Sequence, residues 1–357
     1  MRVTLKEVAL QAGVSYQTVS KVINGQAQVS KETEERIWHV VKQLGYRPNF
    51  TARSLRSNRS FTIGYSWKPN PPNRPSPVLD QLLQSMLQAA AKYGYYLLSF
   101  PTGTDPNDTI SIYRELVFTG RVDGFILSAI EFDDPRIHFL LENEFPFVAF
   151  GRSNPNMIFP FVDVDGGLGI RMATEHFLQQ NHQKIAILAW PESNRVSTNR
   201  IGGYFAAMQA AGIAVLPEWI VREEGAYEVG YQATSRLLDL PEKKRPTAIV
   251  TLNDAMAVGA MCAIQAAGLT VGPDIGVSGF DASPYTEYLS PPLTTVAQPA
   301  WEVGQLVIET LMTGLMENKR PTFTGTLLPP TLVVRQSSLR QPEKGTLSTK
   351  ITQKEGA

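Results

Sequence analysis

Residues 4–24 read TLKEVALQAGVSYQTVSKVIN, and this stretch decides the fold of the N-terminal part of the chain. Thr4 and Glu7 have the spacing of a capping box, so we expect a helix to begin at Leu5. Gly13 can adopt the left-handed conformation that ends a helix in a sharp turn. A second helix is expected from Ser15. The pattern therefore predicts two short helices joined by a tight turn.

The second helix divides its residues between two faces. Val19, Val22 and Ile23 have the spacing of an apolar helix face and are expected to point inward. The outward face then carries Tyr16, Gln17, Ser20 and Lys21. A third helix is expected after a Ser30 cap, with an apolar row of Ile37, Val40, Val41 and Leu44 and an end at Gly45. Residues 1–46 are thus interpreted as an all-α helix-turn-helix domain with a bracing helix, with an ordinary three-helix bundle as the alternative.

Charge is distributed unevenly along the chain. Residues 1–60 hold ten Lys or Arg and four Glu, a net charge of +6. Because the whole chain has a formal net charge of zero, the remaining residues carry −6. A basic segment joined to a more acidic body is typical of a module that binds nucleic-acid phosphates, which favours DNA binding over the ordinary bundle.

The segments TLKEVA (4–9), AGVS (12–15), TVS (18–20) and VIN (22–24) resemble the LacI/GalR family of bacterial transcription regulators. The resemblance continues through GYRPN (45–49) and ARSL (52–55). In that family the second helix lies in the major groove of DNA, so Tyr16, Gln17 and Lys21 match the base-reading positions. Lys21 replaces an Arg of the family and lacks the planar fork that reads guanine, so the operator sequence does not follow. The DNA-binding residues implied by the resemblance are Thr4, Leu5, Ser15, Tyr16, Gln17, Lys21, Asn24, Ser30, Tyr46, Asn49, Ala52 and Leu55.

Residues 47–60 are expected to form a hinge helix or linker. Pro48 suits a first helical position, and a helix of about nine residues is marginal in water, so it should fold only on a partner. In the family two such helices pack in the minor groove, where a leucine opens the central base step. Leu55 matches that leucine, and Ala52 would let the two helices approach. A basic linker with an incidental leucine is the alternative.

The composition of the whole chain, 357 residues with 43% hydrophobic and 18% charged residues, is typical of a soluble globular protein of two or three domains. The sequence predicts neither a membrane span nor a signal peptide. The single cysteine, Cys262, excludes an internal disulfide and fits a reducing cytoplasm, which is the expected location.

From residue 61 onward short apolar runs alternate with helical patterns, which indicates parallel sheets covered by helices on both faces. Strands are expected at 61–66, 95–100, 124–128, 147–150, 161–164, 184–189, 248–252, 275–280 and 294–297, followed by a final pair. The resemblance implies a periplasmic-binding-protein type I fold, an α/β effector-binding and dimerisation domain over 61–340. Lobe 1 is expected at about 61–160 plus 293–320, lobe 2 at about 161–292 plus 321–340, and a disordered tail at 341–357.

Motifs for enzyme chemistry find little support. The expected strands are not followed by a glycine-rich nucleotide-binding motif, and the glycines at 166, 167 and 169 lie inside a probable helix start. The four histidines lack metal-ligand spacing, and none pairs with a candidate nucleophile. The chain is therefore interpreted as a binding protein, not an enzyme, and no cofactor or metal is expected.

Polar residues beside strand ends indicate where a small effector would bind. Arg200, Asn253 and Asp281 match the family's effector-contacting Arg, Asn and Asp, and Arg152 resembles an Arg of its sugar-responsive members. Further effector-binding candidates are Trp67, beside a proline-rich loop at 69–77, and the aromatic residues Phe161 and Tyr227. Asp254 is interpreted as a helix cap. The alternative interpretation of Arg200 is an exposed cation near a helix start, and that of the loop at 69–77 is a surface loop stiffened by proline. Carboxylates, an amide and guanidinium groups suit a neutral polyol, so a sugar is the expected effector.

The sequence therefore predicts a transcription regulator, a repressor, that binds a palindromic double-stranded operator under the control of a small effector. The tail from Gln341 holds few apolar residues and cannot form a coiled coil, so a homodimer is expected. The alternative is a sugar-transport receptor with the same body fold. Such a receptor would need a signal peptide and would lack the basic N-terminal domain.

Overall fold

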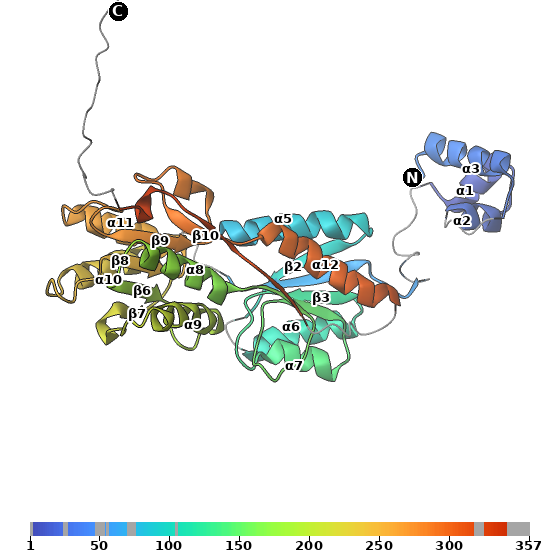
Figure 1. The fold of residues 1–357 in the computed structure, drawn as a ribbon. Helices are drawn as coiled ribbons and strands as arrows, with labels where there is room; N and C mark the ends of the chain where they lie inside the picture. Colours follow the sequence, from blue (N-terminus) through green and yellow to red (C-terminus); the bar gives the residue numbers. More distant parts are fainter. Residues whose placement is uncertain are drawn as a thin grey trace, which may run out of the picture. The chain divides into compact units, whose positions relative to one another are not determined.

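The computed structural model describes residues 3–23, 28–46, 54, 57–69, 76–103, 106–317 and 325–340. The chain divides into two compact units, Met1–Ser60 and Phe61–Ala357, which we call the headpiece and the body. The described headpiece is helical, whereas the body contains two sheets with helices packed around them (Figure 1).

The headpiece contains α1 (Leu5–Ala12), α2 (Tyr16–Ile23) and α3 (Lys31–Leu44). The capping box is present, because Thr4 N donates to Glu7 Oε2 at 2.6 Å and Glu7 N donates to Thr4 Oγ1 at 3.4 Å. Gly13 ends α1 with a φ of 65°, a left-handed conformation that glycine adopts without strain. The three helices enclose a small core of Val8, Ala9, Ala12, Val19, Val22, Ile37, Val40 and Tyr46. The predicted helix start at Leu5 and the helix-turn-helix arrangement are confirmed.

Lobe 1 of the body is built on a parallel sheet with the strand order β11-β5-β4-β3-β1-β2. Its strands are β1 (Thr62–Trp67), β2 (Tyr96–Pro101), β3 (Gly124–Leu127), β4 (Phe147–Phe150), β5 (Phe161–Val164) and β11 (Thr326–Leu328). Its helices are α5 (Pro77–Lys92), α6 (Pro106–Phe118), α7 (Pro135–Glu142) and α12 (Ala300–Glu317). The helices α5 and α12 pack together on one face of the sheet, and α6 and α7 cover the other (Figure 1).

Lobe 2 has the strand order β12-β10-β9-β8-β6-β7, in which only the β12 and β10 pair is antiparallel among the described strands. Its strands are β6 (Ile185–Ala189), β7 (Ile220–Arg222), β8 (Ala248–Thr251), β9 (Gly276–Phe280), β10 (Thr294–Ala297) and β12 (Thr331–Val333). Its helices α8 (Gly166–Gln179), α9 (Arg195–Ala210), α10 (Tyr227–Leu238) and α11 (Asp254–Ala266) pack as the pairs α8 with α9 and α10 with α11. Short 3-10 turns lie at Pro217–Trp219, Pro284–Glu287 and Gln336–Ser338.

The predicted strand positions and the two-lobe α/β fold class are confirmed, because each expected strand lies within one residue of an observed one. Strands β6, β8 and β9 are buried along their whole length. This is why they read as continuous apolar runs rather than alternating ones.

The predicted lobe boundaries need correction at three strands. β5 pairs in parallel with β4 and belongs to lobe 1, although residue 161 was expected to begin lobe 2. β10 pairs with β9 in lobe 2, and β11 pairs with β5 in lobe 1. The chain therefore crosses between the lobes after β5, after β10 and between β11 and β12. An apolar run shows that a strand is buried, but it does not show which sheet the strand joins.

Among the described residues, none of the helices combines the length and the hydropathy needed to cross a membrane. Within the same residues, acidic side chains, histidines and the cysteine do not gather into a group of three that could hold a metal ion.

Candidate DNA interface and effector site

The outward face of α2 presents polar and aromatic side chains. Tyr16 is 50% exposed and Gln17 and Lys21 are also exposed, whereas Val19 and Val22 of the same helix are buried in the headpiece core. Apolar packing on one side thus fixes which side chains α2 offers to a partner. The arrangement suits a helix that lies in a DNA groove.

Three other predicted DNA-binding residues stabilise helix starts. Thr4 and Ser30 accept hydrogen bonds from the backbone N–H groups of Glu7 and Thr33. Ser15 accepts one from Thr18 N at 3.1 Å and so caps α2, which begins at Tyr16 and not at Ser15 as expected. These residues lie at the surface, where they hold exposed helix N-termini that are favourable places for phosphate oxygens.

Tyr46 and Leu5 pack against the headpiece core. Tyr46 is only 9% exposed and belongs to that core, so most of its side chain packs internally. Leu5 is half-buried against the same core. The remaining predicted contacts, Asn24, Asn49, Ala52 and Leu55, lie outside the described residues, as do most of the expected hinge helix, residues 70–75 of the proline-rich loop and the tail.

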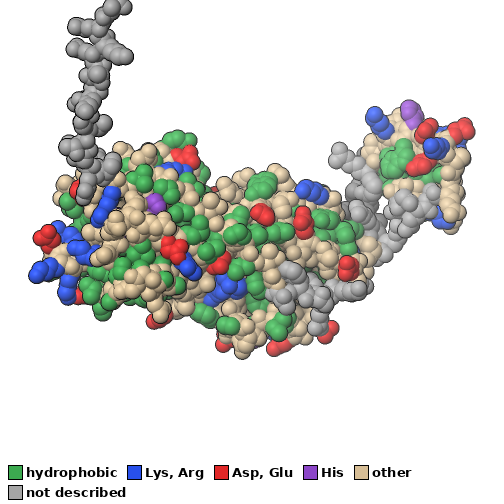
Figure 2. All heavy atoms as spheres, in the orientation of Figure 1, with side chains coloured by type: hydrophobic (Ala, Val, Ile, Leu, Met, Phe, Trp, Pro, Cys, Tyr) green, Lys and Arg blue, Asp and Glu red, His purple; other side chains and the backbone are tan. Residues whose placement is uncertain are grey.

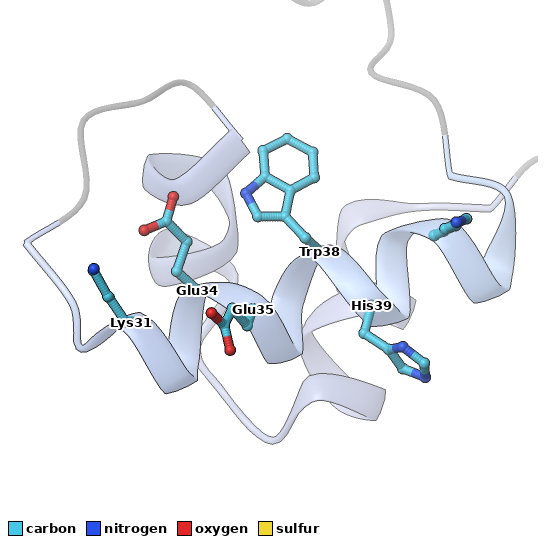
Figure 3. A pocket seen from close by; sticks show the side chains of 6 residues that line it. Lys31, Glu34, Glu35, Trp38 and His39 are labelled. Carbon is cyan, nitrogen blue, oxygen red and sulfur yellow. The ribbon is translucent and has the colours of Figure 1, made fainter.

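The outer surface of α3 carries a shallow depression lined by Lys31, Glu34, Glu35, Trp38, His39 and Lys42 (Figure 3). All six side chains come from one helix, and Trp38 is 45% exposed. Without a second element to form an opposite wall, the depression does not have the enclosed shape of a small-molecule site.

In the body, a side chain that carries a polar group lies at or just beyond the carboxyl end of each parallel strand of lobe 2. These residues are Trp190 after β6, Arg222 in β7, Asn253 after β8, Asp281 after β9 and Gln298 after β10. The carboxyl ends of parallel strands share one edge of the sheet, which is where open α/β sheets bind ligands.

Arg200 of α9 lies at this edge and is 6% exposed. Its guanidinium carbon lies 3.6 Å from the ring centroid of Phe280 and 5.2 Å from that of Trp190. Its Nη1 donates to the carbonyl of Leu252, its Nη2 lies 4.0 Å from Asp281 Oδ1, and its buried Nε has no partner among the described residues. Burial lowers the pKa of this guanidinium, and the charge of Asp281 opposes that shift. Arg200 is therefore not the exposed cation of the alternative interpretation.

Asp281 has an unusual backbone conformation for a non-glycine residue, with a φ of 112°. Its carboxylate accepts a hydrogen bond from Gln298 Nε2 at 2.7 Å, and its side chain keeps 26% exposure. Burial raises the pKa of this carboxyl, whereas the charge of Arg200 lowers it. Strained conformations of this kind persist where the surrounding structure imposes them, and they concentrate at functional sites.

The cap of α11 is Asn253 and not Asp254 as expected. Asn253 has extended backbone, its side chain accepts from Met256 N at 2.9 Å, and its Nδ2 donates to Gly225 O at 2.9 Å. Asp254 is the first helical residue and is buried, where it accepts from Ser283 N at 2.7 Å and from Thr295 Oγ1. Burial, together with the nearby charge of Asp281, raises the pKa of Asp254 to about 7.

A second group of charges joins the two lobes. Arg152, which follows β4 of lobe 1, donates through Nε to Asp163 Oδ2 at 2.7 Å and through Nη2 to Asn199 Oδ1 at 3.4 Å. Arg195, at the start of α9 in lobe 2, lies 3.5 Å from the same Asp163 oxygen. We call Arg152, Asp163, Arg195 and Asn199 the inter-lobe cluster. Acidic and basic side chains also lie side by side on the face of the body shown in Figure 2.

Of the predicted effector residues, the structure brings Arg200 and Asp281 together, places Asn253 at the same edge and places Arg152 in the inter-lobe cluster. Trp67 ends β1 and is half-buried against the lobe 1 core. Phe161 begins β5, at the opposite end of that strand from the crossing into lobe 2, and packs on Phe159. Phe161 therefore lies at the amino end of its strand, away from the carboxyl-end edge, although the strand was predicted with these same bounds.

Tyr227 begins α10 and is 41% exposed, and Gly225, two residues before it, accepts from Asn253 Nδ2. The pKa of the Tyr227 hydroxyl is raised, chiefly by a hydrogen bond with the Cys262 thiol. The sequence prediction missed Trp190, Arg195, Asn199, Asp163 and Gln298. Trp190 and Gln298 directly follow predicted strands, so the strand-end rule that selected Asp281 would also have selected them.

The chain is similar to proteins of known family. Residues 4–49 match the model of bacterial regulatory proteins of the lacI family, and residues 174–338 match a periplasmic binding protein-like domain. The ribose operon repressor of Haemophilus influenzae is 33% identical over 340 residues, which cover 94% of this chain and 98% of the relative. The chain belongs to the LacI family.

Solved structures of LacI-family proteins resemble most of the chain. A regulatory protein from Chloroflexus aggregans is 48% identical with a TM-score of 0.75, covering 78% of this chain and 99% of that one. The lac repressor dimer bound to operator and an anti-inducer is 29% identical with a TM-score of 0.81, covering 95% and 100%. The protein is a DNA-binding transcriptional repressor and not an enzyme, as predicted, and the transport-receptor alternative is wrong.

Proposed function

We propose that this LacI-family repressor binds its operator as a homodimer and is controlled by a sugar-type effector held where the two lobes meet. The observation that carries the proposal is the pairing of Arg200 with Asp281 at the strand ends of lobe 2, beside the inter-lobe cluster. These groups can donate to and accept from ligand hydroxyls. The name of the ribose operon repressor supports a sugar.

The inter-lobe cluster supplies a physical route from effector to DNA. Asp163 of lobe 1 faces Arg195 of lobe 2, and Arg152 of lobe 1 donates to Asn199 of lobe 2. A ligand that alters these contacts changes the relative stability of different lobe arrangements. Effector affinity and operator affinity are then coupled reciprocally, as linkage requires.

The DNA part of the proposal rests on the face of α2 that carries Tyr16, Gln17 and Lys21. A homodimer would present two such helices to the halves of a palindromic double-stranded operator. The lac repressor relative was solved as a dimer on its operator, which supports this assembly. A repressor that acts on chromosomal DNA would work in the cytoplasm.

The effector is tested by thermal stabilisation of the full chain with a panel of mono- and disaccharides. A ligand at about 100 times its Kd should add roughly 2.7 kcal/mol to the free energy of unfolding. Asp281→Asn should weaken binding of any ligand found at least tenfold, because a charged hydrogen-bond partner is lost. Asp239→Asn, which changes an exposed carboxylate of the same lobe, should not.

The direction of control follows from operator titrations of the same variants with and without that ligand. For an inducer, Asp281→Asn should keep operator bound in the presence of ligand; for a corepressor, it should fail to bind operator when ligand is added. Unchanged ligand affinity in Asp281→Asn would show that the effector binds elsewhere.

The DNA-reading face is tested by selecting operator half-sites from a random pool. Gln17→Ala should change the preferred base at particular positions, where a good contact contributes about 1–3 kcal/mol of discrimination. Lys42→Ala, on the bracing helix α3, should return the wild-type motif. Identical motifs from Gln17→Ala and wild type would overturn the assignment of α2.

A further inference from the structure

Arginines at the meeting of the lobes have more hydrogen-bond donors than the protein satisfies. The Arg195 side chain is 11% exposed, and within the described part of the chain it donates no hydrogen bond; its ion pair with Asp163 spans 3.5 Å. Arg200, which is 6% exposed, has an unpartnered Nε and reaches Asp281 only at 4.0 Å. Each guanidinium group carries five N–H donors, and the Nε of Arg200 is a buried donor without a partner among the described residues.

The nearby carboxylates are already engaged. Asp163 accepts from Arg152 Nε through one oxygen and from Val164 N through the other. Asp281 accepts from Gln298, and Asp254 accepts from Ser283 N and Thr295 Oγ1. Among the described residues, Asp163 is the carboxylate within ion-pair distance of Arg195, and it also pairs with Arg152. A further anionic acceptor would therefore complement Arg195.

Arg195 and Arg200 act on the same region. They lie five positions apart on α9, and the charge of Asp163 acts on both guanidinium groups. Arg152 approaches that carboxylate from lobe 1. The guanidinium groups of Arg152 and Arg195 thus share one carboxylate, and Trp190 adds a buried indole N–H without a partner among the described residues.

We propose that the effector is an anionic sugar derivative, a polyhydroxylated molecule whose carboxylate or phosphate group binds Arg195 together with Arg152 or Arg200. This inference rests on the proposed function and specifies the ligand class. A planar guanidinium fork binds two oxygens of a carboxylate or phosphate at once, which a neutral hydroxyl cannot match. Asp281 and Gln298, at the same edge of the sheet, remain to bind ligand hydroxyls.

An anion at this position also explains how binding reaches both lobes. The ligand's oxygens compete with Asp163 for Arg195, and this ion pair is one of the contacts that join α9 of lobe 2 to β5 of lobe 1. Occupation of the site therefore replaces a lobe-to-lobe contact with ligand contacts to both lobes.

The first test uses inorganic phosphate as the probe, with sodium chloride at matched ionic strength. Phosphate should raise the thermal midpoint of the full chain more than chloride does, and Arg195→Gln should lose that difference. Arg195→Lys should retain part of it, because the charge remains without the fork. Arg171→Gln is the matched control, since Arg171 pairs with Glu175 on the exposed surface of α8 and should behave as wild type. Equal shifts in all variants, or no phosphate shift in wild type, would overturn the proposal.

The second test compares each neutral sugar with its uronic acid and its phosphate ester, for example D-glucose, D-glucuronate and D-glucose 6-phosphate. An anionic member should bind at least tenfold tighter than its neutral counterpart, and Arg195→Gln should remove that preference. The acid and the ester distinguish carboxylate from phosphate. If a neutral sugar binds tighter and changes operator affinity, the anionic inference fails but the proposed function stands. If neutral and anionic members all leave operator affinity unchanged, the proposed function fails.

Discussion

Two adjacent glycines of α9 give the sharpest test of how this helix is held. A Cβ built on Gly203 would lie 1.9 Å from the carbonyl oxygen of Gly167 and 3.0 Å from Arg171 N, both backbone atoms of α8. A Cβ on Gly202 meets nothing within 4 Å, and Gly202 is exposed. The same substitution one residue apart therefore probes packing and helix propensity separately.

Gly203→Ala must push α8 and α9 apart by about 1 Å or more, because the contacting atoms belong to helix backbones and cannot rotate away. Overpacking of this kind typically costs about 1–3 kcal/mol, and we expect the upper end of that range. Gly202→Ala should instead add roughly 0.5–1 kcal/mol of stability, since alanine favours the helix. Because the gain in helix propensity applies to both glycines, the two variants should differ by the overpacking cost itself, about 3 kcal/mol.

The assay is urea unfolding of the full chain followed by far-ultraviolet circular dichroism, with the dependence on urea compared among variants. Because α9 carries Arg195 and Arg200, Gly203→Ala should also weaken binding at the meeting of the lobes, whereas Gly202→Ala should not. A Gly203→Ala variant within about 1 kcal/mol of wild type would refute the packing argument, since the loss expected from overpacking would be missing.

Three further predictions concern buried or capping groups. Arg136 donates to both oxygens of the buried Asp134 carboxylate at 2.9 and 2.6 Å, so Arg136→Met would leave that charge buried without its partner. Urea unfolding should show a loss of about 3–5 kcal/mol in the free energy of unfolding, and a loss below about 1 kcal/mol would contradict this. Thr4→Ala should cost about 1 kcal/mol and speed amide exchange in α1, and unchanged exchange would show that the cap is dispensable. The Asp254 carboxyl should make stability fall as pH rises from about 4 to about 7, because the folded chain holds this proton over that range while the unfolded chain releases it. Buried His182, whose pKa is lowered to about 4, acts in the opposite direction, so the test is the difference between variants: the stability of Asp254→Asn should fall less with pH than that of wild type, and identical slopes would refute the burial argument.

The local elements of this protein could be predicted because their signals lie close together in the chain. The capping box at Thr4 and Glu7, the left-handed end at Gly13 and the apolar row of α2 involve neighbouring residues. Strands such as β6 were found because burial on both faces leaves a continuous apolar run. Apolar spacing also placed Gln17 and Lys21 on the outer face of α2.

The residues at the carboxyl ends of the lobe 2 strands could be predicted only in part. The strand-end rule and the family resemblance found Arg200, Asn253 and Asp281. The expectation of an aromatic face for a sugar selected Phe161 and Tyr227, but Phe161 lies at the amino end of β5, because residue type alone does not show which side chains meet at one edge of a sheet. The rule had no means of finding Arg195, because its partner Asp163 belongs to the other lobe.

The sequence by itself determined the helix-turn-helix, the basic headpiece and the positions of the strands, because these depend on the order and spacing of nearby residues. Only the tertiary structure decided that β5 and β11 belong to lobe 1 and β10 to lobe 2. Only it brought Arg152, Asp163 and Arg195 together from three separate elements. The physical reason is that hydrophobic periodicity records whether a side chain is buried, whereas the identity of its neighbour is set by chain crossings between lobes that leave no periodic signal.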